Sequence, residues 1–140
     1  MNTEQLRVLL VDDDPFVTNL LTRHLETEGI NQIQVARNTS ECLVSMSECD
    51  IVILDYWLME ENGIDILREI KSKSPDLPVI FLSGQEFVTI AIRSLKYGAF
   101  DYLEKNKLNF DRLIEVINSA MLSSDKKRKV QQDNNLRNII

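Results

Sequence analysis

The sequence predicts one α/β domain: a five-stranded parallel sheet, doubly wound, with five helices over its two faces. The chain alternates five times between a short apolar run and a longer segment with helical spacing of apolar residues. Its four glycines and three prolines fall almost entirely where this alternation needs a break. Such alternation is typical of parallel sheets whose crossover helices cover both faces. A length of 140 residues suits a single domain with a substantial core.

The first half of the chain contains three of the expected strands and two helices. Asp14-Pro15, a capping carboxylate followed by proline, opens the first helix, and Gly29 is placed to end it in a left-handed conformation. The third strand is apolar throughout, which favours burial on both faces. The expected strands are 6–11, 33–36 and 51–54, and the expected helices are 15–28 and 39–46.

The second half contains two further strands and three helices. Asn62-Gly63 opens the third helix, and Gly98 ends the fourth. The expected strands are 78–82 and 99–103, and the expected helices are 63–74, 86–97 and 110–122. After Leu122 the apolar density drops, so we expect residues 1–122 to form the domain and 123–140 to form a helical extension or linker. The run Lys126-Lys127-Arg128-Lys129 leaves a basic docking segment as the alternative.

The composition restricts the classes of partner. Sixteen basic against 22 acidic residues give a net charge of −6, which argues against direct nucleic-acid binding and favours a site that takes a cation. Cys42 and Cys49 form neither a zinc motif nor a disulfide pattern, so we expect reduced thiols. No apolar stretch is long enough to span a membrane, and the first residues do not resemble a signal peptide. We therefore expect a cytoplasmic location.

Charged and polar residues follow the ends of four expected strands. Asp12 and Asp13 follow the first strand, Asp55 the third, Ser83 the fourth and Lys105 the fifth. The carboxyl ends of parallel strands share one edge, so these residues should lie close together. Three carboxylates would repel one another, and Mg²⁺, which prefers oxygen ligands, would resolve this. A lysine and a hydroxyl suit a phosphoryl group, so Asp55 is a candidate nucleophile that would form an acyl phosphate.

These stretches resemble the receiver domain of two-component response regulators, over about residues 6–122. The resemblance is carried by Leu9-Leu10-Val11-Asp12-Asp13-Asp14-Pro15, Ile53-Leu54-Asp55, Phe81-Leu82-Ser83-Gly84 and Asp101-Tyr102-Leu103-Glu104-Lys105. It implies a flavodoxin-like fold with the strand order 2-1-3-4-5. It also implies phosphorelay signalling, in which a histidine kinase or a histidine phosphotransfer protein donates a phosphoryl group to Asp55. The chain would be a phosphoacceptor that assists its own phosphorylation and dephosphorylation, and not an enzyme.

The same resemblance implies roles for the other residues. Magnesium would be held by Asp13, Asp55 and the backbone carbonyl of Trp57, and Asp12 would act through a metal-bound water. Lys105 and Ser83 would hold the phosphoryl oxygens. Ser83 and Tyr102 would form a switch pair, in which the aromatic ring follows the hydroxyl inward. The face made by the fourth helix, fifth strand and fifth helix would contact an output partner or a second copy of the chain.

Two positions depart from the pattern of that family. Met59 and Asn106 stand where proline is usual, so the geometry of the loop after Asp55 and of the Lys105-Asn106 peptide is left open. The lone histidine, His24, is expected to be a boundary residue of the first helix and not a phosphohistidine.

Two other functions compete with this interpretation. A haloacid-dehalogenase-like phosphatase would use Asp12 as nucleophile with Asp14 as the second acid, but it would leave Asp55 unexplained. A degenerate receiver would only bind partners. The sequence identifies neither the kinase nor the output nor the oligomeric state. It is compatible with a free-standing receiver and with a fragment of a longer regulator or hybrid kinase.

Overall fold

Five parallel strands form the central sheet of the computed structural model, which describes residues 3–58, 60–84, 88–107 and 109–139. The strands are β1 (Arg7–Val11), β2 (Gln32–Ala36), β3 (Ile51–Asp55), β6 (Val79–Ser83) and β7 (Asp101–Glu104). They are arranged in the order β2-β1-β3-β6-β7, and every neighbouring pair is parallel. This arrangement confirms the expected order 2-1-3-4-5, because β4 and β5 lie outside the main sheet.

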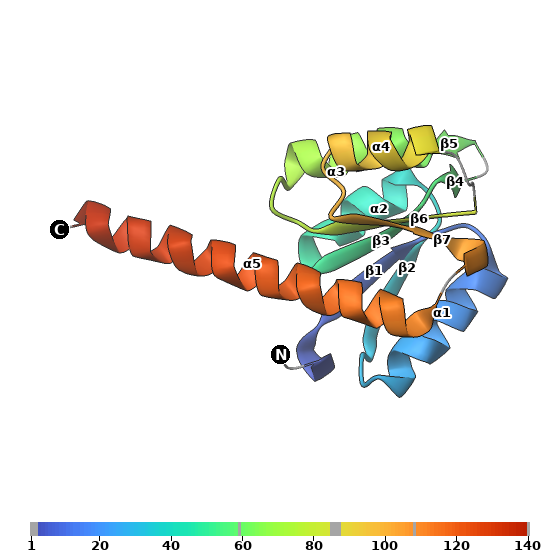
Figure 1. Ribbon diagram of the computed structural model, residues 1–140, viewed down its shortest axis with the longest axis horizontal. Coiled ribbons are helices and arrows are strands. Elements are labelled where there is room, and N and C mark those ends of the chain that lie inside the picture. Colours follow the sequence, from blue (N-terminus) through green and yellow to red (C-terminus); the bar gives the residue numbers. More distant parts are fainter. Residues whose placement is uncertain (1–2, 59, 85–87, 108, 140) are drawn as a thin grey trace.

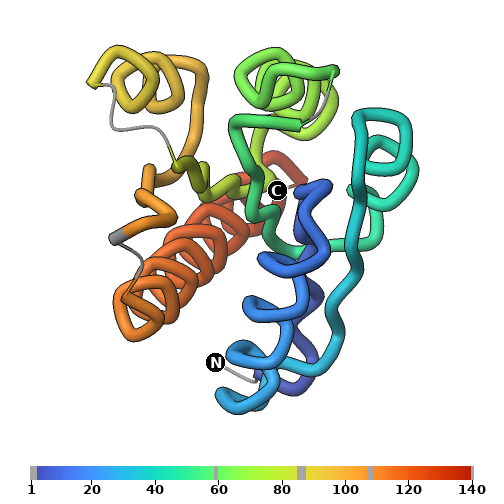
Figure 2. Tube along the Cα trace, turned by 90° about the vertical axis from the view of Figure 1, so that its right-hand side faces the viewer, coloured from blue at the N-terminus to red at the C-terminus, as the bar shows by residue number. Residues whose placement is uncertain are grey.

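Helices cover both faces of the sheet (Figure 1). One face is covered by α1 (Pro15–Thr27) and α5 (Phe110–Ile139), and the other by α2 (Thr39–Ser45), α3 (Gly63–Lys73) and α4 (Val88–Lys96). Figure 2 shows the two helical layers from the side. The central strands β3 and β6 are buried at every position, as expected for strands covered on both faces.

Local interactions define where the helices begin and end. Asp14 accepts a hydrogen bond from the backbone of Phe16 at 3.0 Å, and Asn62 caps α3 by accepting from the backbone of Ile64 at 2.7 Å. Gly29 and Gly98 have positive φ angles of 84° and 102°, the conformation expected of glycines that follow helices. The glycine and capping predictions are therefore confirmed at these positions.

Two elements differ from the sequence-based expectation. The fifth helix does not end at Leu122 but continues to Ile139, and its residues from 125 onwards are exposed. The second difference is a hairpin of β4 (Trp57–Leu58) and β5 (Glu61–Asn62), which the sequence analysis did not anticipate.

Smaller differences occur at element boundaries. The last strand begins at Asp101 and not at Ala99, because the backbone of Ala99 still bonds to Ser94 at the end of α4. Short 3₁₀ turns complete the chain at Thr3–Gln5, Met46–Glu48 and Lys105–Lys107. Met59 and the expected start of the fourth helix at Glu86 lie outside the described residues. Within the described ranges, no helix is long and apolar enough to cross a membrane.

Candidate functional site

Three carboxylates meet at the carboxyl ends of β1 and β3. Asp12 and Asp55 are only 4% and 5% exposed, and Asp13 is half-buried. One carboxylate oxygen from each of the three lies within 4.8 Å of those of the other two. Buried charges of the same sign are costly unless a cation balances them. The cluster therefore needs positive charge.

Lys105 supplies one positive charge from the turn that follows β7. Its Nζ lies 2.8 Å from Oδ2 of Asp12 and 3.0 Å from Oδ1 of Asp55. A single lysine thus bridges carboxylates from two different strands. Three carboxylates and one ammonium leave an excess of negative charge when all are ionised, so the site remains suited to a further cation.

Burial changes the acid–base behaviour of this cluster. Burial and then the neighbouring Asp12 raise the pKa of Asp55 to about 6, against the opposing effect of Lys105 and of the Trp57 backbone N–H. For Lys105, burial lowers the pKa, but its contacts with Asp12 and Asp55 outweigh burial and the net pKa is raised. Lys105 is therefore positively charged at neutral pH. Ionising Asp55, by contrast, costs free energy in the folded chain.

The donor set of the acidic cluster fits Mg²⁺. Asp12, Asp13 and Asp55 offer only oxygen atoms, which hard divalent cations prefer, and Asp13 remains accessible to a hydrated ion. Among the residues that the structure describes, these three form the acidic group that could hold a metal. Metal binding by the cluster is thus supported by its chemistry.

Ser83 and Tyr102 lie on neighbouring strands beside the acidic cluster. Ser83 is fully buried at the end of β6. The ring of Tyr102 stacks on Phe81, with ring centroids 6.1 Å apart and an interplanar angle of 18°. Burial raises the pKa of Tyr102, and a side-chain hydrogen bond with Ser83 opposes this effect. The serine and the tyrosine are therefore directly connected.

The backbone after Asp55 is packed against the start of α3. The Gly63 N–H donates to the Tyr56 carbonyl at 2.8 Å. A Cβ atom at position 63 would collide with the carbonyl oxygen of Asp55 and would lie 2.8 Å from Cα of Tyr56. Only glycine fits here, a role that the sequence analysis did not assign to Gly63. The sequence signal that could have indicated this role is the position of Gly63, directly after a capping asparagine and eight residues after Asp55.

The two loops with unusual residues are only partly described. Trp57 is 57% exposed, and its ring meets that of Tyr56 edge to face with the ring centroids 4.9 Å apart. No cis peptide bond occurs in the described ranges, which include the bond between Lys105 and Asn106. The geometry of the Lys105-Asn106 peptide, which the sequence left open, is therefore trans.

His24 lies apart from the acidic cluster. Its ring stacks on Phe110 at a centroid distance of 4.0 Å, so it belongs to the contact between α1 and α5.

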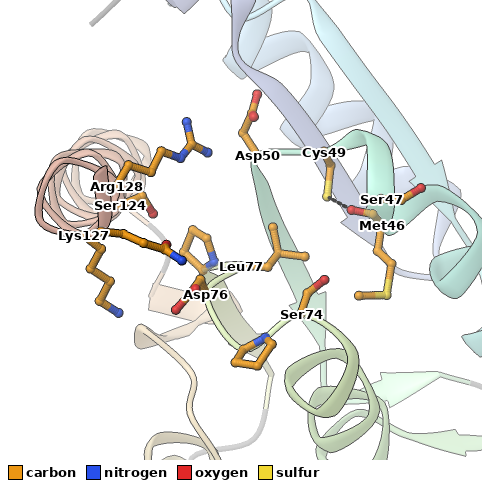
Figure 3. A pocket seen from close by; sticks show the side chains of 13 residues that line it. Met46, Ser47, Cys49, Asp50, Ser74, Asp76, Leu77, Ser124, Lys127 and Arg128 are labelled. Atoms are coloured by element: carbon orange, nitrogen blue, oxygen red, sulfur yellow. Dashed lines mark hydrogen bonds between the residues drawn. The ribbon is translucent and has the colours of Figure 1, made fainter. Parts of the chain in front are cut away.

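The sheet's opposite edge carries a separate pocket of about 330 Å³ (Figure 3). It lies between α5 and the segments that lead into β3 and β6, and Asp50, Asp76, Lys127 and Arg128 contribute to its walls. None of the predicted site residues lines it.

The structure is a doubly wound parallel sheet whose carboxyl edge gathers three oxygen-donor acids and a bridging ammonium, which is where open α/β sheets bind their ligands. Residues 8–118 match the family model described as the response regulator receiver domain. The chain belongs to this family. Its function is therefore in two-component phosphorelay signalling.

Three relatives illustrate the match. The chain is 40% identical, over 89% of its length, to a putative NtrX-like response regulator of Rickettsia felis, and spans 27% of that protein. It superposes on a crystal structure of NtrX from Brucella abortus with a TM-score of 0.81 and 32% identity, covering 90% of this chain and 29% of that one. It also superposes on the beryllofluoride-activated NtrC4 receiver domain dimer with a TM-score of 0.77 and 32% identity, covering 84% of this chain and 98% of that one. The chain therefore corresponds to about a quarter of the longer regulators.

Proposed function

We propose that this chain accepts a phosphoryl group on Asp55 from a phosphohistidine of a histidine kinase or phosphotransfer protein. An Asp55 oxygen would form a bond to phosphorus while the phosphorus–nitrogen bond breaks and the histidine nitrogen takes the bonding electron pair. The observation that carries this proposal is the bridge from Lys105 to both Asp12 and Asp55 within the acidic cluster. The same ammonium can follow the charge that moves from the carboxylate to the phosphoryl oxygens.

Mg²⁺ is the proposed cofactor. Asp13, Asp55 and the backbone carbonyl of Trp57 would hold it, and Asp12 would act through a bound water. When bound, the ion would neutralise the charge of the incoming phosphoryl group. Lys105 and the Ser83 hydroxyl would hold the remaining phosphoryl oxygens, and the hydrogen bond between Ser83 and Tyr102 would pass the change to the surface.

The proposed output face is formed by α4, β7 and α5. Helix α4 leaves Val88, Ile92 and Leu95 between 50% and 71% exposed, which suits an apolar partner surface. The similarity to an activated receiver dimer favours a second copy of the chain as that partner. We further propose residues 1–122 as the receiver unit, 123–140 as its helical extension, and a cytoplasmic location. The chain would be a phosphoacceptor and not an enzyme.

Acetyl phosphate with Mg²⁺ tests this function directly. The chain should gain the mass of one phosphoryl group, and borohydride trapping should map it to Asp55. Asp55→Asn should gain nothing, whereas the exposed acid change Asp65→Asn should be labelled normally. Labelling at Asp12 would instead indicate the phosphatase, and an unlabelled chain in the presence of Mg²⁺ would indicate a degenerate receiver.

A further inference from the structure

A carboxylate from the segment after Asp55 caps the N-terminus of α2. Glu61, in β5, accepts a hydrogen bond from the backbone N–H of Thr39 at 3.1 Å and a second one from the Thr39 hydroxyl. Thr39 is the first residue of α2, and the opening N–H groups of a helix have no partner within it. The helix dipole also favours negative charge at this end. Glu61 therefore connects two segments 22 residues apart in sequence.

The residues at the start of α2 make other hydrogen bonds, so the Thr39 N–H is free to donate to Glu61. Asn38 caps the helix through the backbone of Glu41 at 2.9 Å, and the Glu41 carboxylate turns back to the backbone of Arg37 at 2.6 Å. The carboxylate of Glu61 thus completes the cap from outside the helix.

The hairpin carries this contact to the acidic cluster. In the hairpin, Glu61 pairs with Leu58 and Asn62 pairs with Trp57. Leu58 is buried in the core at 1% exposure, and the Trp57 backbone N–H bonds to the Asp55 carboxylate. The position of Glu61 is therefore linked, through two residue pairs, to the backbone next to Asp55.

We propose that Glu61 is a positioning residue for the phosphorylation of Asp55. By tying the hairpin to Thr39, it holds the Trp57 backbone where its carbonyl can complete the Mg²⁺ site, and so sets the Mg²⁺ concentration that the reaction requires. This inference rests on the proposed function. The contact restrains a segment that has methionine at position 59, and not a proline whose ring would restrict the backbone.

The surroundings allow this contact to be removed without loss of the fold. Thr39 and Glu61 line an open pocket of about 410 Å³, together with Glu60, Asp65 and other residues. Water can therefore reach the donors of Thr39 when the carboxylate is absent, so a truncated variant loses the restraint and leaves no buried donor unpaired.

The test compares Glu61→Ala, Thr39→Val and Glu61→Gln with the matched controls Glu60→Ala and Glu60→Gln. The Mg²⁺ concentration for half-maximal effect is measured by Trp57 emission and by the rate of labelling with acetyl phosphate. Glu61→Ala should raise it roughly three- to tenfold, as expected for one or two lost hydrogen bonds, and leave the rate at saturating Mg²⁺ within about twofold. Glu61→Gln keeps an acceptor oxygen and should restore most of the affinity.

Two further readouts separate positioning from general damage. With metal removed by a chelator, backbone amides of residues 57–62 should exchange hydrogen faster in Glu61→Ala and in Thr39→Val. The double variant should behave like Glu61→Ala alone, because Glu61→Ala already removes both hydrogen bonds, whereas Thr39→Val removes only the one from the hydroxyl.

The inference is overturned if Glu61→Ala binds Mg²⁺ like the unaltered chain, or if the Glu60 controls lose as much affinity, since bulk charge would then be the cause. It is also overturned if Glu61→Gln restores nothing, or if amide exchange in the hairpin is unchanged. In each case the unaltered chain would still be labelled at Asp55. An unaltered chain that is never labelled would contradict the proposed function itself.

Discussion

Replacing Asp55 with asparagine should stabilise the metal-free protein at neutral pH. Burial and Asp12 raise the pKa of this carboxyl from 3.8 to about 6, which means that ionisation is harder in the folded chain than in the unfolded one. At about 1.4 kcal/mol for each pKa unit, the folded state loses about 3 kcal/mol of stability once Asp55 is ionised in both states. Asparagine has a similar shape and carries no charge, so it avoids this loss.

The pH dependence gives the prediction its sign. Between pH 3.8 and about 6 the unfolded chain ionises Asp55 while the folded chain keeps it protonated, so the stability of the unaltered protein falls across this range and is level above it. The advantage of Asp55→Asn should therefore be about 3 kcal/mol at pH 7.5 and about 1 kcal/mol at pH 4.5.

Urea unfolding in the presence of a chelator measures this difference at both pH values. In thermal unfolding, the gain at neutral pH should appear as a rise of about 6–12 °C in Tm. Equal stability of the two proteins at pH 7.5 would refute the reasoning, as would a gain that does not change with pH. The exposed change Asp65→Asn is the control; it removes a carboxylate from the first turn of α3 and so should bring no gain in stability at either pH.

Three other results are expected. Gly63→Ala should lower the free energy of unfolding in urea by about 1–3 kcal/mol, because the added methyl group would press on the backbone of Asp55. The control Gly84→Ala should lower it little, since no atom lies within 4 Å of the added carbon. Equal losses in the two variants would contradict the close approach at Gly63. Burial raises the pKa of Cys49 from 9.0 to about 11, which lowers the fraction of reactive thiolate. At pH 8 this thiol should therefore react with Ellman's reagent about 100-fold more slowly in the native protein than in urea. Similar rates in the two conditions would show that the thiol is accessible and not perturbed by burial. Saturating Mg²⁺ should change the emission of Trp57, the only tryptophan, and an unchanged spectrum would count against a metal site beside it.

The parts of the fold that were predictable from the sequence are those with local physical causes. Asp14-Pro15 and Asn62-Gly63 begin helices because their side chains cap free N–H groups within three residues. Gly29 and Gly98 end helices because their φ angles are unfavourable for other residues. The apolar third and fourth strands lie at the centre of the sheet because no polar side chain interrupts them before its edge.

The parts that were not predicted, or were left between two forms, depend on distant contacts or on propensity alone. The hairpin consists of two residues in each strand, too few for a pattern, and Glu61 is held by Thr39, far away in sequence. The continuation of α5 past Leu122 follows from residues such as lysine, arginine and glutamine, which favour helix without burying anything. The sequence analysis expected a helical extension or a linker after Leu122, and the loss of apolar spacing could not decide between the two.

The candidate site shows the same division. Parallel strand ends were enough to bring Asp12, Asp55 and Lys105 together, because topology alone sets that proximity. The different exposure of Asp12 and Asp13 was not predictable from two adjacent and identical residues. It follows from the direction in which each side chain leaves the end of β1.

The long α5 helix, seen protruding in Figure 1, also has a mechanical consequence. Its 30 residues extend about 45 Å, of which about 25 Å lie beyond Leu122. A tilt of about 10° around a pivot near that residue would move the far end by about 4 Å, although atoms at the pivot would hardly shift. The helix is thus a lever arm that magnifies rotation at its base, and a spectroscopic label near its tip would detect reorientations too small to see within the sheet.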